Sequence, residues 1–156
     1  MSKVEQSIEV NVPVRTAYNQ WTQFEDFPQF MEGVNKVLQK DDVTLEWEAE
    51  IAGQNRQWEA KIDEQTPDQR IAWHSTGGDV TQAGVVTFHR LDEGKTKIML
   101  QLDFEPSDWK EKAGDALGII DARIKGDLGR FKKFIEERGQ ETGAWRGEVE
   151  QNDIKK

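Results

Sequence analysis

The sequence predicts an α+β fold in which a seven-stranded antiparallel sheet wraps around one long C-terminal helix, with two short helices after the first strand. Residues 108–138 repeat apolar side chains every three or four positions, which is the spacing of one helix face. Residues 34–104 instead alternate apolar and polar side chains, and the turns between the alternating runs are too short for parallel crossovers. The long helix is the only predicted element of sufficient length to cover the apolar face of this sheet.

The N-terminal part predicts one strand and two short helices. Residues 3–12 alternate as a half-buried strand does. Pro13 stands where a helix begins, and the apolar residues of 14–24 then follow helical spacing. Residues 25–28 break this helix, and residues 28–31 are typical of one further helical turn.

Six strands are expected to follow as a meander of antiparallel neighbours. Their alternating cores lie at residues 34–40, 45–51, 58–62, 71–75, 82–89 and 96–104. The first of these is weak, which favours an edge position. Residues 44–51 alternate most regularly and indicate a strand with one buried face.

The last predicted element is the long helix, over residues 109–138, or about 45 Å. Asp108 and Glu111 suit its N-terminal cap, and Gly139 suits the residue after its C-terminus. Each of the four glycines inside it costs about 1 kcal/mol relative to alanine. They indicate either a kinked surface helix or room for a neighbouring loop or ligand.

At 156 residues without internal repeats, the chain is long enough for one domain with its own core. We assign that domain to residues 1–139, and a polar, flexible tail to residues 140–156. Trp145 and Arg146 stand out in this tail. Trp145 either packs back on the domain or contacts a partner.

The composition excludes several classes of partner. A net charge of −9 argues against nucleic acid and against anionic membrane surfaces, because both repel an acidic protein. No apolar run suits a signal peptide or a membrane span, so we expect a cytoplasmic protein without stable membrane insertion. The lack of cysteine excludes disulfides and a thiol nucleophile. The oligomeric state is not predicted.

Five stretches of the chain carry a resemblance to a known family. They are residues 10–21, 24–31, 71–73, 84–88 and 126–132. Through them the chain resembles, over residues 3–138, the START-like (SRPBCC) superfamily, and within it the polyketide cyclase/dehydrase and lipid-transport family with its coenzyme Q-binding branch. Residues 141–147 further resemble a subgroup of uncharacterised bacterial members. The resemblance implies a helix-grip fold with a cavity between the sheet and the long helix, in a family whose members bind or process many unrelated apolar molecules.

In a helix-grip fold, the inward strand positions form one wall of the cavity and the apolar face of the helix forms the other. The wall residues are Trp47, Trp58, Trp73, Val86, Phe88, Ile98 and Leu100, and the helix contributes Leu117, Ile120, Ile124 and Leu128. Three of these are tryptophans on successive strands, each burying about 150–250 Å². Together they either fill the core or line a pocket for an apolar ligand.

Few polar side chains are candidates for orienting a ligand in this cavity. Strand parity turns Ser75 and Gln82 inward, Arg56 stands at a strand start, and Asp121 lies on the flank of the apolar helix face. Asp121 is either a rim residue, paired with a cation or facing water, or a buried acid.

We predict no catalytic residues, no metal and no cofactor. His74 and His89 fall on the polar side of their strands, so we expect both to be exposed and without a catalytic role. Two outward histidines without cysteines give no group with metal-ligand spacing. Residues 76–79 lack the following helix and lysine of a phosphate-binding loop.

Three functions remain as hypotheses. The first is binding, with possible transport or sequestration, of an apolar small molecule such as a lipid, quinone or isoprenoid, for which the cavity should reach about 300 Å³ or more. The second is a polyketide-type cyclase or dehydrase, which needs a base and oxyanion donors in the pocket. The third is a stress-related or structural interaction module that uses the acidic surface and the Trp145 tail.

Overall fold

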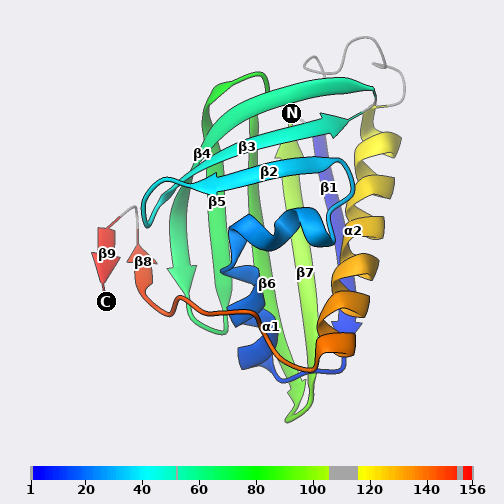
Figure 1. The fold of residues 1–156 in the computed structure, drawn as a ribbon, viewed down its shortest axis with the longest axis vertical. Coiled ribbons are helices and arrows are strands. Elements are labelled where there is room, and N and C mark those ends of the chain that lie inside the picture. The colour runs from blue at the N-terminus through cyan, green and yellow to red at the C-terminus, as the bar shows by residue number, and fades with distance from the viewer. Residues whose placement is uncertain (1, 52, 106–115, 151–152, 156) are drawn as a thin grey trace.

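The fold of the computed structural model is a curled sheet that grips a C-terminal helix (Figure 1). The structure describes residues 2–51, 53–105, 116–150 and 153–155. The elements in chain order are β1 (Ser2–Val10), α1 (Val14–Trp21), the 3-10 helix η1 (Phe24–Gln29), β2 (Val34–Gln39), β3 (Thr44–Ile51), β4 (Gln54–Thr66), β5 (Arg70–Gly78), β6 (Gln82–Asp92), β7 (Lys95–Phe104), α2 (Ala116–Arg138), β8 (Glu148–Glu150) and β9 (Asp153–Lys155). The α+β helix-grip fold predicted from the sequence is therefore confirmed.

The sheet is antiparallel throughout, in the order β1-β7-β6-β5-β4-β3-β2. Strands β2 to β7 form the predicted meander. β1 forms one edge of the sheet and pairs with β7 along its whole length, from Ser2 opposite Phe104 to Val10 opposite Thr96. β2 lies at the other edge, as its weak pattern predicts. α2 packs mainly against β1, so it crosses the concave side of the curled sheet (Figure 1).

The short helices differ in detail from the prediction. α1 ends at Trp21, where the Thr22 hydroxyl donates a hydrogen bond of 2.6 Å to the carbonyl of Asn19. Residues 24–29, part of which we expect to break the helix, instead form the 3-10 helix η1 with Pro28 inside it. The reason is tertiary: the rings of Phe24 and Phe27 are buried, and this packing holds the turn.

The described part of α2 confirms the predicted apolar face. Ile120, Ile124, Leu128, Phe131 and Ile135 are all buried, at the spacing of three or four residues that the sequence predicts. Gly139 ends the helix with φ of 74° and donates its N–H to the carbonyl of Ile135. The expected N-terminal cap and first turns, residues 108–115, lie outside the described residues.

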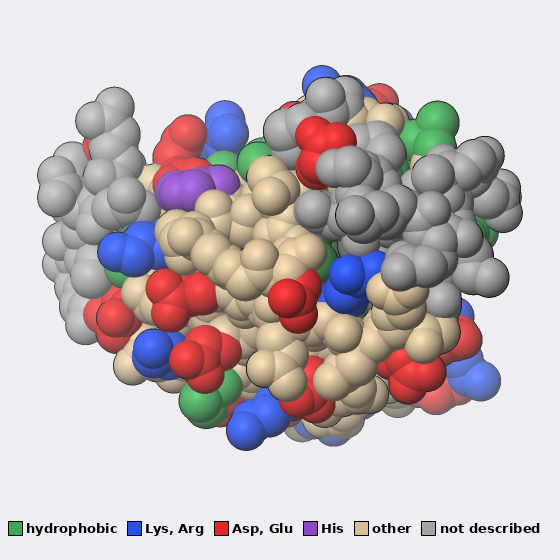
Figure 2. Space-filling view, turned by 90° about the horizontal axis from the view of Figure 1, so that it is seen from above, with side chains coloured by type: hydrophobic (Ala, Val, Ile, Leu, Met, Phe, Trp, Pro, Cys, Tyr) green, Lys and Arg blue, Asp and Glu red, His purple; other side chains and the backbone are tan. Residues whose placement is uncertain are grey.

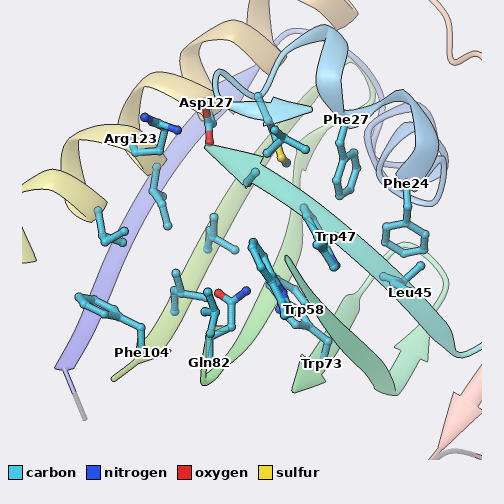
Figure 3. A pocket seen from close by; sticks show the side chains of 18 of the residues that line it. Phe24, Phe27, Leu45, Trp47, Trp58, Trp73, Gln82, Phe104, Arg123 and Asp127 are labelled. Carbon is cyan, nitrogen blue, oxygen red and sulfur yellow. The ribbon is translucent and has the colours of Figure 1, made fainter. Parts of the chain in front are cut away.

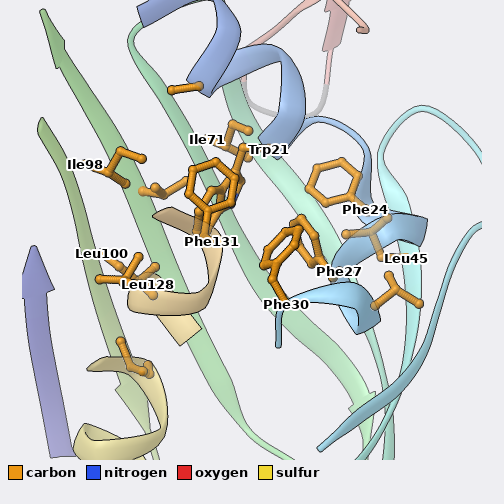
Figure 4. Close-up of a cluster of buried hydrophobic side chains, with 14 of the residues drawn as sticks. Trp21, Phe24, Phe27, Phe30, Leu45, Ile71, Ile98, Leu100, Leu128 and Phe131 are labelled. Carbon is orange, nitrogen blue, oxygen red and sulfur yellow. The ribbon is translucent and has the colours of Figure 1, made fainter. Parts of the chain in front are cut away.

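An aromatic cluster joins α1, η1 and α2 (Figure 4). The ring of Trp21 lies 4.9 Å from that of Phe131 and 5.8 Å from that of Phe27, both edge to face. Phe30 contacts Phe131 at 5.1 Å between centroids. Such edge-to-face pairs add about 0.5–1.5 kcal/mol each beyond their buried area. The cluster therefore holds α1 and η1 against α2, next to the cavity.

The segment after Gly139, whose composition favours a flexible tail, lies against the domain up to residue 150. The backbone N–H of Trp145 donates to the Thr22 hydroxyl at 3.1 Å, and its indole packs against the core, so of the two alternatives the structure shows the one in which Trp145 packs back on the domain. Strand β8 then pairs with β4, and Val149 is 1% exposed. Packing of Trp145 and Val149, together with the hydrogen bonds, outweighs the polar composition of the segment.

On the face in Figure 2, the described acidic and basic side chains are scattered among other polar groups and backbone, and the described hydrophobic side chains show only in small areas. Among the described residues, no helix is both long and apolar enough to span a membrane.

Candidate functional site

A cavity of about 140 Å³ lies between the concave face of the sheet and α2, with η1 over one side (Figure 3). Its walls are almost wholly apolar. They are formed by Trp21, Phe24, Phe27, Met31, Glu32, Val34, Leu45, Trp47, Ala49, Trp58, Ile62, Ile71, Trp73, Val80, Gln82, Leu100, Leu102, Phe104, Ile120, Arg123, Ile124, Asp127 and Leu128. A more open hollow of about 480 Å³ lies on β2 to β5, and its lining mixes charged residues (Lys36, Glu46, Glu48 and Glu59) with uncharged ones that include Trp47 and Trp58.

The three tryptophans of the sheet all line this cavity, on one side of it (Figure 3). Trp47 and Trp58 are directly opposite each other on β3 and β4, and their rings stack with centroids 5.7 Å apart and planes 4° apart. Trp73, on β5, lies over Gly84 of β6, where a Cβ atom would stand 2.8 Å from the indole Cε2. The glycine therefore makes room for the third ring of the wall.

The stacked pair brings two polar atoms into the apolar wall. The indole nitrogens of Trp47 and Trp58 are buried, and neither meets an acceptor among the described protein atoms. A buried donor without an acceptor costs about 1–3 kcal/mol, because it has given up its hydrogen bond to water. Most buried polar groups in proteins are paired, so two unpaired donors in one wall need an explanation.

The opposite side of the cavity, on α2, carries a charged group formed by Arg123 and Asp127 (Figure 3). Arg123 donates to the carbonyls of Glu32 and Glu50, at 2.7 and 3.4 Å. Asp127 accepts the backbone N–H of Glu32 at 3.1 Å and a hydrogen bond from Arg130 at 2.5 Å. These contacts tie the loop after η1 to the helix and close this side of the cavity.

Burial raises the pKa of Asp127 to about 6, although the hydrogen bond and charge of Arg130, the backbone N–H of Glu32 and the charge of Arg123 all lower it. The carboxyl is 14% exposed, so loss of hydration outweighs its partners. Asp127 is therefore the one group among the cavity-lining residues for which a pKa near neutrality is found.

The close approach of this loop depends on Gly33, between η1 and β2. Its φ of 83° lies in the left-handed region that favours glycine. A Cβ atom there would stand 2.5 Å from the carbonyl oxygen of Glu50 and would also overlap the guanidinium of Arg123. The absence of a side chain thus lets Arg123 bridge the two backbone segments.

The structure brings half of the predicted lining residues to the cavity. They are Trp47, Trp58, Trp73, Leu100, Ile120 and Ile124. Leu128 and the polar candidate Gln82 also line it. Gln82 lies away from Arg123 and Asp127, at the other end of the cavity (Figure 3).

Three inward residues of the predicted wall are not part of the cavity. Val86, Phe88 and Ile98 are buried on the expected face, but they belong to the solid core. Phe88 packs 5.4 Å from the ring of Tyr18 and 6.2 Å from that of Trp21, both on α1. The prediction of a lining role fails here because α1 covers this end of β6 and β7 and fills the space.

The remaining candidates also lie elsewhere. Leu117 is 51% exposed, at the start of the described part of α2. The Ser75 hydroxyl accepts the backbone N–H of Gln82 at 3.0 Å and so joins β5 to β6. Asp121 accepts a hydrogen bond of 2.8 Å from Gln6 on β1, at the outer flank of the helix, and Arg56 contacts Gln54. None of the four lines the cavity.

Both histidines are outside the cavity, as predicted. His89 is exposed, and the His74 ring, with 44% of its side chain exposed, lies 2.8 Å from Asp63 on the outer face. Within the described residues, no group of three or more histidine, cysteine or acidic side chains is placed to hold a metal ion.

Sequence reasoning missed the aromatic residues of η1 and the charged pair on α2. Phe24 and Phe27 form a dense apolar run in the sequence, but nothing local places this run over the sheet. Arg123 and Asp127 stand three residues after Ile120 and Ile124, so helical spacing puts them beside the buried face. That spacing was the available signal, but it does not single out Arg123 and Asp127, because other residues that flank the buried face of the helix share it.

Comparison with known protein families, relatives and solved structures agrees with the fold described above. The family described as polyketide cyclase / dehydrase and lipid transport matches residues 10–133. A protein of Streptomyces lincolnensis, described as an uncharacterized 17.2 kDa protein in the melC2-rnhH intergenic region, is 61% identical over 149 residues, covering 96% of this chain and 99% of that protein.

Solved structures share the fold. The Zhui aromatase/cyclase of Streptomyces sp. R1128 matches with a TM-score of 0.75 at 18% identity, over 92% of this chain and 99% of that one. A START superfamily protein from Mycobacterium smegmatis matches with a TM-score of 0.64 at 20% identity, over 85% of this chain and 98% of that one.

Proposed function

The chain belongs to the polyketide cyclase/dehydrase and lipid transport family, and on that premise we propose that it binds an apolar small molecule, such as a lipid, a quinone or an isoprenoid, in the cavity between the sheet and α2. The observation that supports this most is the partly open, apolar cavity with aromatic side chains from both the sheet and η1. Such a cavity, with few polar groups, is typical of small-molecule sites.

The volume of the cavity sets a limit on what it holds without rearrangement. At about 140 Å³ it falls below the 300 Å³ expected of a site for a drug-sized ligand. It is close to the volume, about 150 Å³, of a cavity that takes up benzene. A ring-sized unit therefore fits, and a larger ligand requires the aromatic side chains to move apart.

Mass spectrometry of gently purified protein tests the proposal. A stoichiometric apolar molecule, present under native conditions and released by solvent extraction, is the expected result. A protein that is empty and that also takes up no benzene-sized apolar compound in solution would contradict ligand binding.

A filled variant ties such binding to the cavity. Ile120 lines the cavity from α2, so Ile120→Trp places a larger side chain in the space. Leu117→Trp is the matched control, because Leu117 lies on the same helix but is 51% exposed. We expect the first variant to lose the bound molecule and the second to keep it; equal occupancy in both would place the molecule elsewhere.

The second candidate function, a polyketide-type cyclase or dehydrase, is favoured by one observation. Asp127 is an acid in the cavity wall whose pKa, raised by burial to about 6, suits proton transfer near neutral pH. The sequence candidates for this chemistry, Arg56, Ser75 and Asp121, lie outside the cavity.

Turnover of a linear polyketide-like ketone tests this alternative. Asp127→Asn keeps the shape of the side chain and removes its proton transfer, so turnover should fall by about 10²- to 10⁴-fold. Asp121→Asn, on the outer flank of α2, should leave it unchanged. Equal turnover by the two variants would contradict a catalytic role for Asp127.

A further inference from the structure

The indole nitrogens of Trp47 and Trp58 limit which class of ligand suits the cavity. Trp47 and Trp58 both line the cavity, and Trp58 is 7% exposed. Their indole nitrogens meet no acceptor among the described protein atoms. A phenylalanine at either position would pack a ring into the same wall without the cost of an unpaired donor.

The arrangement holds the two donors together. Trp47 and Trp58 are cross-strand neighbours, and their rings are parallel with centroids 5.7 Å apart. The two adjacent, parallel indole rings lie on the sheet side of the cavity (Figure 3), and each carries a buried N–H group without an acceptor. Unpaired buried donors are uncommon in proteins, and each one calls for an explanation.

The charged residues of the cavity do not supply that partner. Asp127 already accepts from Arg130 and from the backbone of Glu32. It lies with Arg123 on α2, on the other side of the cavity from the two tryptophans (Figure 3). Glu32 and Gln82, the other polar side chains of the lining, accept no hydrogen bond from either indole. The acceptor that suits the indoles is therefore an atom of the ligand.

The charges around the cavity favour a neutral oxygen as that acceptor. Arg123, the one cationic side chain that lines the cavity in the described part of the chain, is bonded to two backbone carbonyls and stands beside Asp127. An anionic ligand would therefore lose its hydration without gaining a free cation. A ketone, ester or phenol oxygen loses less hydration, and the indole N–H groups replace its hydrogen bonds to water.

We propose, on the basis of the proposed ligand-binding function, that the part of the ligand held in the cavity is an uncharged, ring-sized apolar unit bearing an oxygen acceptor, and that Trp47 and Trp58 donate their indole N–H groups to it. Both indole nitrogens are buried in the structure, so the proposed hydrogen bonds require the stacked rings to move apart. The same movement enlarges the cavity beyond its present 140 Å³.

Acetophenone and α-methylstyrene form a matched pair of probes, because the second replaces the carbonyl oxygen of the first by a CH₂ group and keeps its shape. We expect acetophenone to bind the wild-type protein about three- to tenfold more tightly relative to its partition into an apolar solvent. In ¹H–¹⁵N spectra, acetophenone should move two of the six indole N–H signals downfield, and α-methylstyrene should not.

Variants assign the effect to residues. Trp58→Phe and Trp47→Phe keep a ring in the wall and remove one donor, so each should reduce the preference for acetophenone and abolish one shifted signal. Trp73→Phe is the control in the same wall, because the unpaired donors belong to the stacked pair. The comparison of the two probes on the wild-type protein needs no variant, so it tests the proposal even where a variant does not fold.

The outcomes separate this inference from the function on which it rests. Equal binding of the two probes, with no selective indole shift, overturns the oxygen acceptor and leaves apolar binding in place. Binding of neither probe to the wild-type protein overturns both. A shift confined to Trp73 would move the acceptor away from Trp47 and Trp58 and would also overturn the inference.

Discussion

The raised pKa of Asp127 predicts how the stability of the protein depends on pH. The pKa is 3.8 for an ordinary aspartate and about 6 in the folded protein, chiefly because the carboxyl is buried. A difference of two units corresponds to about 3 kcal/mol, at 1.36 kcal/mol per unit. The folded state holds the proton more tightly than the unfolded chain, so this stability is present below the unfolded pKa and is lost as pH rises through the folded one.

The variant Asp127→Asn isolates this effect, because the asparagine cannot titrate and its oxygen still accepts the backbone N–H of Glu32. Urea unfolding of both proteins, followed by tryptophan emission between about pH 3.5 and 7.5, gives the difference in free energy of unfolding. All other titrating groups are shared and largely cancel in that difference. We expect the wild type to lose about 3 kcal/mol relative to the variant as the pH rises through about 6.

A direct titration of the carboxyl carbon by NMR should show a midpoint near pH 6 for Asp127. A free-energy difference that is independent of pH, or one that grows in favour of the wild type as pH rises, would refute the reasoning. In that case the hydrogen bonds from Arg130 and Glu32 outweigh the loss of hydration.

Three further predictions concern packing and charge. Gly84→Ala places a Cβ atom 2.8 Å from Trp73 Cε2, and it should cost about 1–3 kcal/mol in urea unfolding. Phe131→Ala empties a site that is 0% exposed and should cost about 3–5 kcal/mol in the same assay. The pKa of Glu136 is lowered, because the hydrogen bonds from Lys132 and a backbone N–H outweigh the raising effect of burial. Glu136 therefore stabilises the fold above its unfolded pKa, and Glu136→Gln should lower stability at neutral pH with a difference that vanishes in acid.

Matched variants check these values. Gly94→Ala has nothing within 4 Å of the new Cβ atom, so equal losses at Gly84 and Gly94 would contradict the packing argument. Phe134→Ala, on the same helix but only partly buried, should cost less than Phe131→Ala. For Glu136, a difference that persists at low pH would show that charge is not its source.

The local periodicity of the sequence determined most of the fold. Alternation along residues 44–51 and 58–62 put Trp47 and Trp58 on one face, and spacing of three or four residues put Ile120 and Ile124 on one face of α2. Both patterns are local, because each side-chain direction follows from the backbone geometry of its own element. The fold class and half of the candidate lining residues followed from them.

Only the tertiary structure decided where along each strand the cavity begins and ends. Phe88 and Leu100 both face inward, yet Phe88 lies under α1 in solid core and Leu100 lines the cavity. Parity gives the face of a sheet but not the position of a helix over it. Leu117 illustrates the same limit on α2, since helical spacing continues past the end of the buried surface.

The surroundings of Asp127 and the position of the C-terminal segment were also decided by the tertiary structure. Asp127 has its raised pKa chiefly because other segments bury it, and one of its donors, the backbone N–H of Glu32, is 95 positions away in the chain. Trp145 likewise becomes an anchor through Thr22, which is 123 positions away. A sequence pattern reports the direction of a side chain within its own element. Loss of hydration and the donors that oppose it depend on which other segments come to lie against that side chain, and folding alone brings those segments together.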